Sequence, residues 1–180
     1  MNLKKNKIDN KKPVEGDGDL DSEYMKILKN TIESNSKVIT FLHNTEHCET
    51  ADKIIKDGFE FQSYLDFTTD VVTAKDEVAI KYFTIVRQAY GKFTIVIQIS
   101  KQLIDEYSQQ LENMSHHFSE VLSVKEPYVG KDDDMIYCLA PHFIKGYINA
   151  DTAELHKNPN FNASLKIPVF EENLKKIINR

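Results

Sequence analysis

Three polar residues, His43, Asn44 and Thr45, follow an apolar stretch and stand directly before a segment with helical periodicity. At such a strand-to-helix junction, an imidazole and free backbone N–H groups could face a ligand that carries phosphate or ribose. A histidine that closes a strand can equally hydrogen-bond a neighbouring loop and play a purely structural part. The residues alone leave both interpretations open.

A second group of polar side chains comes late in the chain. Asp132, Asp133 and Asp134 directly precede an apolar stretch that begins at Met135. If that stretch is a strand, at least one of these carboxylates could project from its edge into a cleft. Three successive acids are also typical of a solvated turn. Both interpretations are again compatible with the sequence.

A metal site is not expected. His43 and His47 are four residues apart, with Cys48 adjacent, and on one continuous helix they would match a pair of zinc ligands. The expected change from strand to helix at Thr45 breaks that geometry, and no second cysteine or histidine pair has fitting spacing. Cys48 and Cys138 lack C-x-x-C spacing, so we expect free, buried thiols and a reducing, cytoplasmic location.

Composition excludes several classes of protein. A formal charge of -5 disfavours a protein whose main task is to coat nucleic acid, because such binding neutralises phosphates. No apolar stretch approaches a membrane span and no signal-peptide core follows the N-terminus, so we expect no membrane partner. Glycine-rich phosphate loops and G-x-S-x-G elbows are also missing, which leaves P-loop and serine-hydrolase functions without support.

The residues must be positioned by one α+β domain. Residues 1–22 are almost all polar and indicate a disordered tail, and residues 23–180 indicate a single domain. Helices are predicted from Asp21 or Ser22 to the breakers at 34–36, over 45–57, 73–90 and 100–113, and over 168–180. Strands are predicted over 37–43, ending at 67–69, and over 92–99, 135–140 and 143–148.

Local signals set three of these boundaries. Thr45 is the expected N-cap of the second helix, and Gly58 is the residue best suited to end it. Thr73 and Asp76 form a variant of the capping box, with Asp in place of Glu, at the start of the third helix.

The order of these segments resembles the ADP-ribosyltransferase fold family. Phe41-Leu-His-Asn-Thr45 and Ile54-Ile55-Lys-Asp-Gly58-Phe59 are similar to the family's H-G-T motif and its I-x-x-x-G-F helix end. Phe67-Thr68-Thr69-Asp70 with Ala79 and Tyr82-Phe83 resembles its aromatic-Thr-Thr segment and A-x-x-Y-A helix. The segments 91–99 and 135–148 resemble its central strand and its late strand pair, so the likeness spans residues 37–150.

This resemblance implies a fold and a set of roles. The fold would be a split, two-sheet mixed β core with peripheral helices. His43 would contact the ribose of NAD, with Asn44 and Thr45 beside it, while Phe67 and Tyr82 would pack near the nicotinamide. Asp134, or Asp133 one position earlier, would take the place of the catalytic acid that stabilises a positively charged ribose.

Two functions follow from the resemblance. The first is a mono-ADP-ribosyltransferase that moves ADP-ribose from NAD, as substrate, to a protein or nucleic-acid acceptor. The second is a degenerate member that binds a nucleotide or a protein partner through the loop 114–134, with Phe118 and Tyr128 in the contact surface. Asp is one methylene shorter than Glu, and Asn44 replaces a glycine of the motif; both departures favour the second function.

Overall fold

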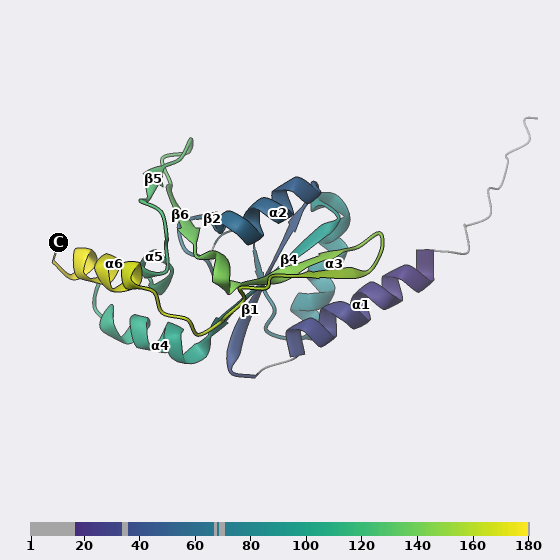
Figure 1. Cartoon of the computed structure of the whole chain (residues 1–180), viewed down its shortest axis with the longest axis horizontal. Helices are drawn as coiled ribbons and strands as arrows, with labels where there is room; N and C mark the ends of the chain where they lie inside the picture. Colours follow the sequence, from purple (N-terminus) through teal and green to yellow (C-terminus); the bar gives the residue numbers. More distant parts are fainter. Residues whose placement is uncertain (1–16, 34–35, 67, 69–70, 180) are drawn as a thin grey trace, which may run out of the picture.

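The computed structural model describes residues 17–33, 36–66, 68 and 71–179, and for residues 17–20, 33 and 86–89 the backbone alone. Its helices are α1 (Asp17–Glu33), α2 (Cys48–Asp57), α3 (Glu77–Tyr90), α4 (Lys101–Gln110), α5 (Phe118–Val121) and α6 (Pro168–Ile178), with a 3-10 turn at Pro141–Phe143. Its strands are β1 (Val38–Thr45), β2 (Phe59–Gln62), β3 (Val72–Thr73), β4 (Phe93–Ser100), β5 (Tyr128–Val129), β6 (Met135–Leu139), β7 (Ile144–Asn149) and β8 (Glu154–Lys157) (Figure 1).

The strands form two separate sheets. Five strands pair in the order β3-β1-β4-β7-β8 and three in the order β2-β6-β5. The α+β class and the split into two sheets are confirmed. The prediction of a mixed core is wrong, because every pairing is antiparallel. The strand that follows α2, β2, enters the smaller sheet.

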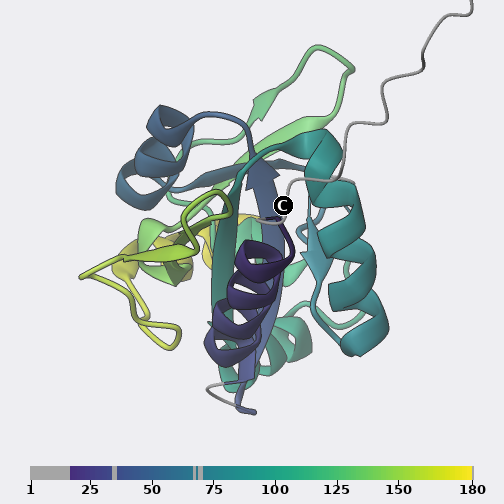
Figure 2. The ribbon, with the colours of Figure 1, turned by 90° about the vertical axis from the view of Figure 1, so that its right-hand side faces the viewer.

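The centre of the larger sheet is β4, whose side chains are buried on both faces. Ile95, Ile97 and Ile99 point into a core shared with α2, α4, α6 and the smaller sheet. Val96, on the opposite face, packs in a second core with α1 and α3. Figure 2 shows α1 lying across β1 and β4 on this second face. The larger sheet is therefore a divider between two apolar layers.

The first helix is longer than predicted. It begins at Asp17, so residues 17–22, assigned to the tail, are helical. Tyr24 and Leu28 of this helix are completely buried against the sheet. Residues 1–16 of the predicted tail lie outside the described part of the chain.

The second helix ends where predicted and begins later. Its N-cap is His47, and Thr45 is instead the last residue of β1. Gly58 ends the helix with φ +99° and donates its N–H to the carbonyl of Ile54 at 3.0 Å. Its ψ of 171° places it in an extended region that only glycine enters readily, rather than in the left-handed helical region.

In the segment 59–77, two predicted element boundaries differ from those of the structure. The short strand of this segment is β2 at its start, and Thr68 is not in a strand; Phe67 and Thr69 lie outside the described residues. The third helix is capped by Asp76, whose Oδ1 accepts the N–H of Ala79 at 2.8 Å. Thr73, the predicted cap, is in β3 opposite Phe41.

The predicted late strands and the predicted last helix are confirmed. β6 and β7 follow each other as predicted, but the turn at Pro141–Phe143 sends them into different sheets. The predicted loop 114–134 contains α5 and β5. Across the described ranges, no helix combines the length and apolar character that crossing a bilayer requires.

Candidate functional site

His43 lies where the two sheets meet. It is the sixth residue of β1, opposite Ile95 of β4, and its side chain is half-buried on the face that carries the larger core. Its imidazole ring is 4.8 Å from the ring of Phe59, the first residue of β2 in the smaller sheet. The contact joins two segments of the predicted site, the strand end with His43 and the helix end before Phe59.

Two glycines make this junction close. A Cβ atom on Gly58 would lie 2.2 Å from the carbonyl oxygen of Leu139 in β6. A Cβ atom on Gly91 would lie 2.3 Å from the carbonyl oxygen of Thr45, and Gly91 has φ +130°. Both positions therefore require glycine, Gly58 beside β6 and Gly91 beside the end of β1.

Asn44 faces the other side of the sheet. Its Oδ1 accepts a hydrogen bond from Thr94 Oγ1 at 2.9 Å, and that hydroxyl is also 2.8 Å from the hydroxyl of Tyr24 in α1. All three side chains are buried. Asn44 therefore ties α1 to the sheet, and the structure does not bring its side chain together with His43. Thr45, two residues after His43, returns to the His43 face and is buried.

The candidate acids lie at the tip of the β5–β6 hairpin. Asp133 and Asp134 are exposed, Asp133 has φ +61°, and the Asp134 carbonyl accepts the N–H of Gly130 at 2.7 Å. The solvated turn weighed from the sequence is thus what the backbone forms. Asp134 is at the end of β6 away from Leu139, the partner of Phe59. Five residue steps of extended strand separate the two ends by roughly 17 Å.

The two candidate aromatic residues cannot both be placed. Tyr82 is 59% exposed on α3, and that helix packs through Ile80 and Phe83 on the α1 side of the sheet. Tyr82 therefore does not share a face with His43. Phe67 lies outside the described residues. Of the predicted set, the structure groups His43 and Thr45 on one face and separates both from Asn44 and Tyr82.

A cluster that the sequence did not reveal connects α2 to β7. The hydroxyl of Tyr147 donates to Asp52 Oδ1 at 2.9 Å and lies 3.4 Å from Cys48 Sγ. Burial and these two neighbours raise the pKa of Tyr147 above its usual range. Cys48 is half-exposed, so the prediction that it is buried is wrong, whereas Cys138 is buried and both thiols are free. Nothing in the spacing of these residues pointed to the cluster.

A second missed cluster has the composition of a hydrolytic triad. Ser119 Oγ lies 2.8 Å from His117 Nδ1, and His117 Nε2 lies 3.2 Å from Asp66 Oδ1. Ser119 is completely buried, and its Oγ accepts the backbone N–H of Leu65 at 3.3 Å. Because no substrate can reach this hydroxyl, the cluster has a structural role, and its contacts hold the turn at 64–66 against α5.

The same cluster also shifts the pKa of Asp66. Burial raises the pKa of its carboxyl, but the hydrogen bond with His117, together with backbone hydrogen bonding and nearby positive charge, outweighs burial and holds that pKa below its usual value. His117 also caps α5, because its Nδ1 accepts the N–H of Ser119 at 3.3 Å.

Within the described residues, no group of three or more His, Cys, Asp or Glu side chains gathers in a way that could hold a metal ion.

Comparison with known proteins gives this chain no relatives. No protein-family model, no curated protein and no solved structure matches it.

Proposed function

We propose that this protein is a mono-ADP-ribosyltransferase that uses NAD as its substrate. The observation that carries the proposal is the contact between His43 and Phe59 at the junction of two antiparallel sheets. The two segments whose sequences resemble the family motifs are in contact there. In addition, the glycine of the second motif has a physical reason to be glycine, because a Cβ would collide with Leu139.

The proposed roles follow from the faces on which the residues lie. His43 and Thr45 share a face of β1 and would orient the ribose of NAD by hydrogen bonds. When the bond between ribose and nicotinamide breaks, nicotinamide leaves with the bonding electrons and positive charge develops on the ribose. Asp134, or Asp133, would stabilise that charge once the hairpin tip, which lies roughly 17 Å along β6 from Leu139, moves toward the ribose, and a nucleophile of a protein or nucleic-acid acceptor would then form the new bond. Phe67 would provide an apolar wall.

Two residues named from the sequence have no part in this proposal. Asn44 accepts a buried hydrogen bond from Thr94, whose hydroxyl also contacts Tyr24 of α1, and Tyr82 faces solvent on the far side of the sheet. The remaining set is His43, Thr45, Phe67 and one of the two carboxylates.

A binding module without catalysis is the second candidate, and one observation favours it. Both carboxylates are exposed in a turn at the tip of a hairpin, and charges there are screened by water more than in a dry site. The contact surface would be narrower than expected, because Phe118 is buried whereas Tyr128 is 53% exposed. Val129 and Met135 extend this exposed apolar strip along the same hairpin.

The deciding experiment measures NAD binding and NAD consumption on the same protein. Calorimetric titration with NAD is combined with chromatographic detection of released nicotinamide and with intact mass measurement of added acceptors. We expect saturable binding that His43→Ala abolishes, together with nicotinamide release that Asp134→Asn or Asp133→Asn slows by about 10²–10³-fold. Asp132→Asn, in the same acidic run, is the matched control and should keep full turnover.

The other outcomes are equally informative. Saturable, His43-dependent binding without nicotinamide release would establish the binding module. Turnover that survives in both Asp134→Asn and Asp133→Asn would contradict the role given to the carboxylates. The absence of any heat of NAD binding, with the thermal melting curve intact, would contradict both nucleotide-based candidates.

A further inference from the structure

A hollow lies at the opposite end of β1 from His43. It has a volume of about 970 Å³, which is the size of a pocket for a small organic ligand. Its walls are the chain around Val38, the outward face of α4 and residues 161–164. Val38 and His43 are separated by five residue steps of β1, or roughly 17 Å. The hollow is therefore a separate place from the proposed NAD site.

A buried hydroxyl without a partner lines this hollow. Ser100 is the N-cap of α4 and is 8% exposed, but its side chain makes no capping hydrogen bond. Among the described residues, nothing else hydrogen-bonds its Oγ. Its backbone is fixed on both sides: the Ser100 N–H donates to Ala163 at 2.8 Å, and the Lys101 N–H donates to Lys37 at 2.9 Å. A buried hydroxyl without a partner costs free energy, which a ligand can recover.

The start of α4 adds further donors beside this hydroxyl. The first N–H groups of a helix have no partner inside the helix, and an N-cap side chain normally accepts from the second or third of them. Because Ser100 does not, the N–H groups of Gln102 and Leu103 keep their donor capacity at the start of α4, where Ser100, Lys101 and Gln102 line the hollow. The positive end of the helix dipole lies at the same point, so the group best suited to it is an anion.

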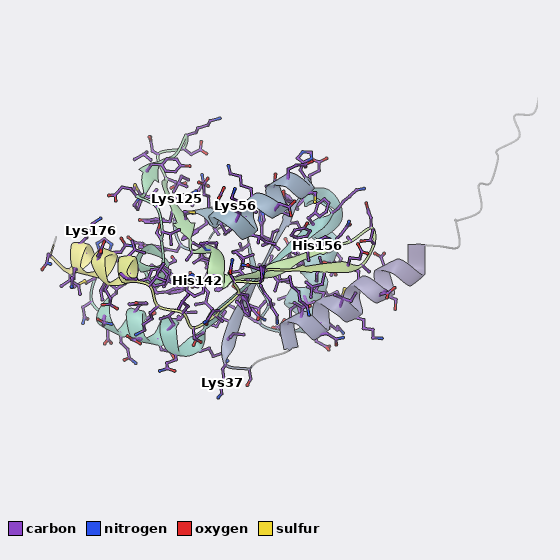
Figure 3. The ribbon with its side chains drawn as sticks, viewed as in Figure 1. Lys37, Lys56, Lys125, His142, His156 and Lys176 are labelled. Atoms are coloured by element: carbon purple, nitrogen blue, oxygen red, sulfur yellow. The ribbon has the colours of Figure 1, made fainter. Side chains whose placement is uncertain are left out.

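Charged side chains around the hollow define which anion. Lys37 and Lys101 line it near the start of α4, and both are exposed. In Figure 3, Lys37 lies at the lower edge of the molecule, opposite Lys56 on α2. Asp105 and Glu106 line the hollow further along the helix, and Glu106 is engaged by Lys166. The positive charge is thus confined to one end, and a carboxylate faces the other.

We propose that this hollow binds a sugar phosphate, with the phosphate at the start of α4 and sugar hydroxyl groups beside Asp105. The phosphate oxygens accept from Ser100 Oγ, from the first free N–H groups of α4 and from the ammonium of Lys101. The Asp105 carboxylate accepts hydrogen bonds from the hydroxyl groups, as acidic residues do for ribose in dinucleotide sites. A phosphodianion matches the positive charge at this end of the hollow, and a neutral sugar alone would not.

The test uses ribose 5-phosphate, inorganic phosphate and free ribose as probes of the full chain, in a buffer free of phosphate and sulfate. Backbone amide resonances are followed during each titration. We expect saturable shifts of the Gln102 and Leu103 amides with ribose 5-phosphate, weaker ones with inorganic phosphate and none with ribose. Lys101→Met should weaken binding of ribose 5-phosphate about tenfold or more, and Ser100→Ala should weaken it several-fold.

Three matched variants make the result decisive. Lys56→Met removes an equally exposed lysine from another helix and should leave ribose 5-phosphate binding unchanged. His43→Ala should also leave it unchanged, which separates this site from the proposed NAD site. Asp105→Asn should weaken ribose 5-phosphate binding and leave inorganic phosphate binding intact. The proposal is overturned if no saturable shifts occur at the start of α4, or if Lys56→Met weakens binding as much as Lys101→Met.

Discussion

Gly58→Ala tests whether the junction beneath His43 has the tight geometry described above. Gly58 has φ +99° and ψ 171°, a backbone region in which a residue with a Cβ atom loses roughly 1–3 kcal/mol. The added Cβ would also lie 2.2 Å from the Leu139 carbonyl oxygen and 3.0 Å from Cys138 Sγ. The oxygen belongs to the backbone of β6, so relief requires that β2 and β6 move apart next to Phe59.

The expected cost combines strain with the weakened strand pairing. Loss of one buried hydrogen bond adds about 1 kcal/mol, so the free energy of unfolding should fall by about 2–4 kcal/mol. For a chain of this size that lowers the melting temperature by about 4–16 °C. Urea unfolding followed by far-ultraviolet circular dichroism measures the first quantity, and thermal scans measure the second.

Gly130→Ala is the matched control for this measurement. A Cβ atom on Gly130 would lie 3.0 Å from the flexible end of the Ile136 side chain and 3.3 Å from the Asp134 carbonyl oxygen, and Gly130 has no positive φ within the strained range. Gly130→Ala should lower the free energy of unfolding by less than about 1 kcal/mol. Equal destabilisation by Gly58→Ala and Gly130→Ala would refute the geometry assigned to the sheet junction, and with it the reason given for a glycine before Phe59.

Three other measurements test separate parts of the structure. Tyr24→Phe removes a buried hydroxyl from Thr94 and should lower the free energy of unfolding by about 1 kcal/mol, measured by urea unfolding, without changing the affinity for NAD. Ser119→Ala should cost about 1–3 kcal/mol because it deletes the bond to His117, and a serine-directed phosphonate should label neither protein. Burial lowers the pKa of His142 below 6.5, so the unfolded chain takes up more protons as pH falls; stability should decrease from about pH 7 to about pH 5, and less so in His142→Gln.

Sequence reasoning located most elements because their signals are local. The strand over 92–99, the helix end at Gly58 and the last helix after Pro168 each depend on periodicity or on a single residue with a known backbone preference. Every one of these was confirmed to within a residue or two. The split into two sheets was also expected, whereas the antiparallel direction of the strands was not.

The missed boundaries share one physical cause. Thr45 and Thr73 were both taken as helix caps, yet threonine is also a favourable strand residue. Each threonine is paired in the large sheet, Thr45 with Phe93 and Thr73 with Phe41. Strand pairing therefore outweighed local capping, and residues nearer each helix took the cap position.

The short α5 and β5 gave no periodic signal, because four residues and two residues are too few to show one.

The candidate site was only partly accessible to the same reasoning, and β1 shows why. Adjacent residues of a strand point to opposite faces, so His43 and Asn44 cannot both line one ligand site once the strand continues to Thr45. Predicting that the strand ended at His43 concealed this consequence. Clusters such as Cys48 with Asp52 and Tyr147 depend on contacts across the fold, and no spacing along the chain announces them.

The same alternation constrains any ligand at the end of β1. Only every second residue can face it, which selects His43 and Thr45 on one face and Leu42 and Asn44 on the other. The second face is closed by α1, where Asn44 and Leu42 are buried. A ligand at this junction must therefore approach from the side of the smaller sheet and meet His43 beside Phe59. Any acid that assists catalysis must reach the ligand from that same side, and β6, which leads from Asp134 to the partner of Phe59, is the strand that lies there.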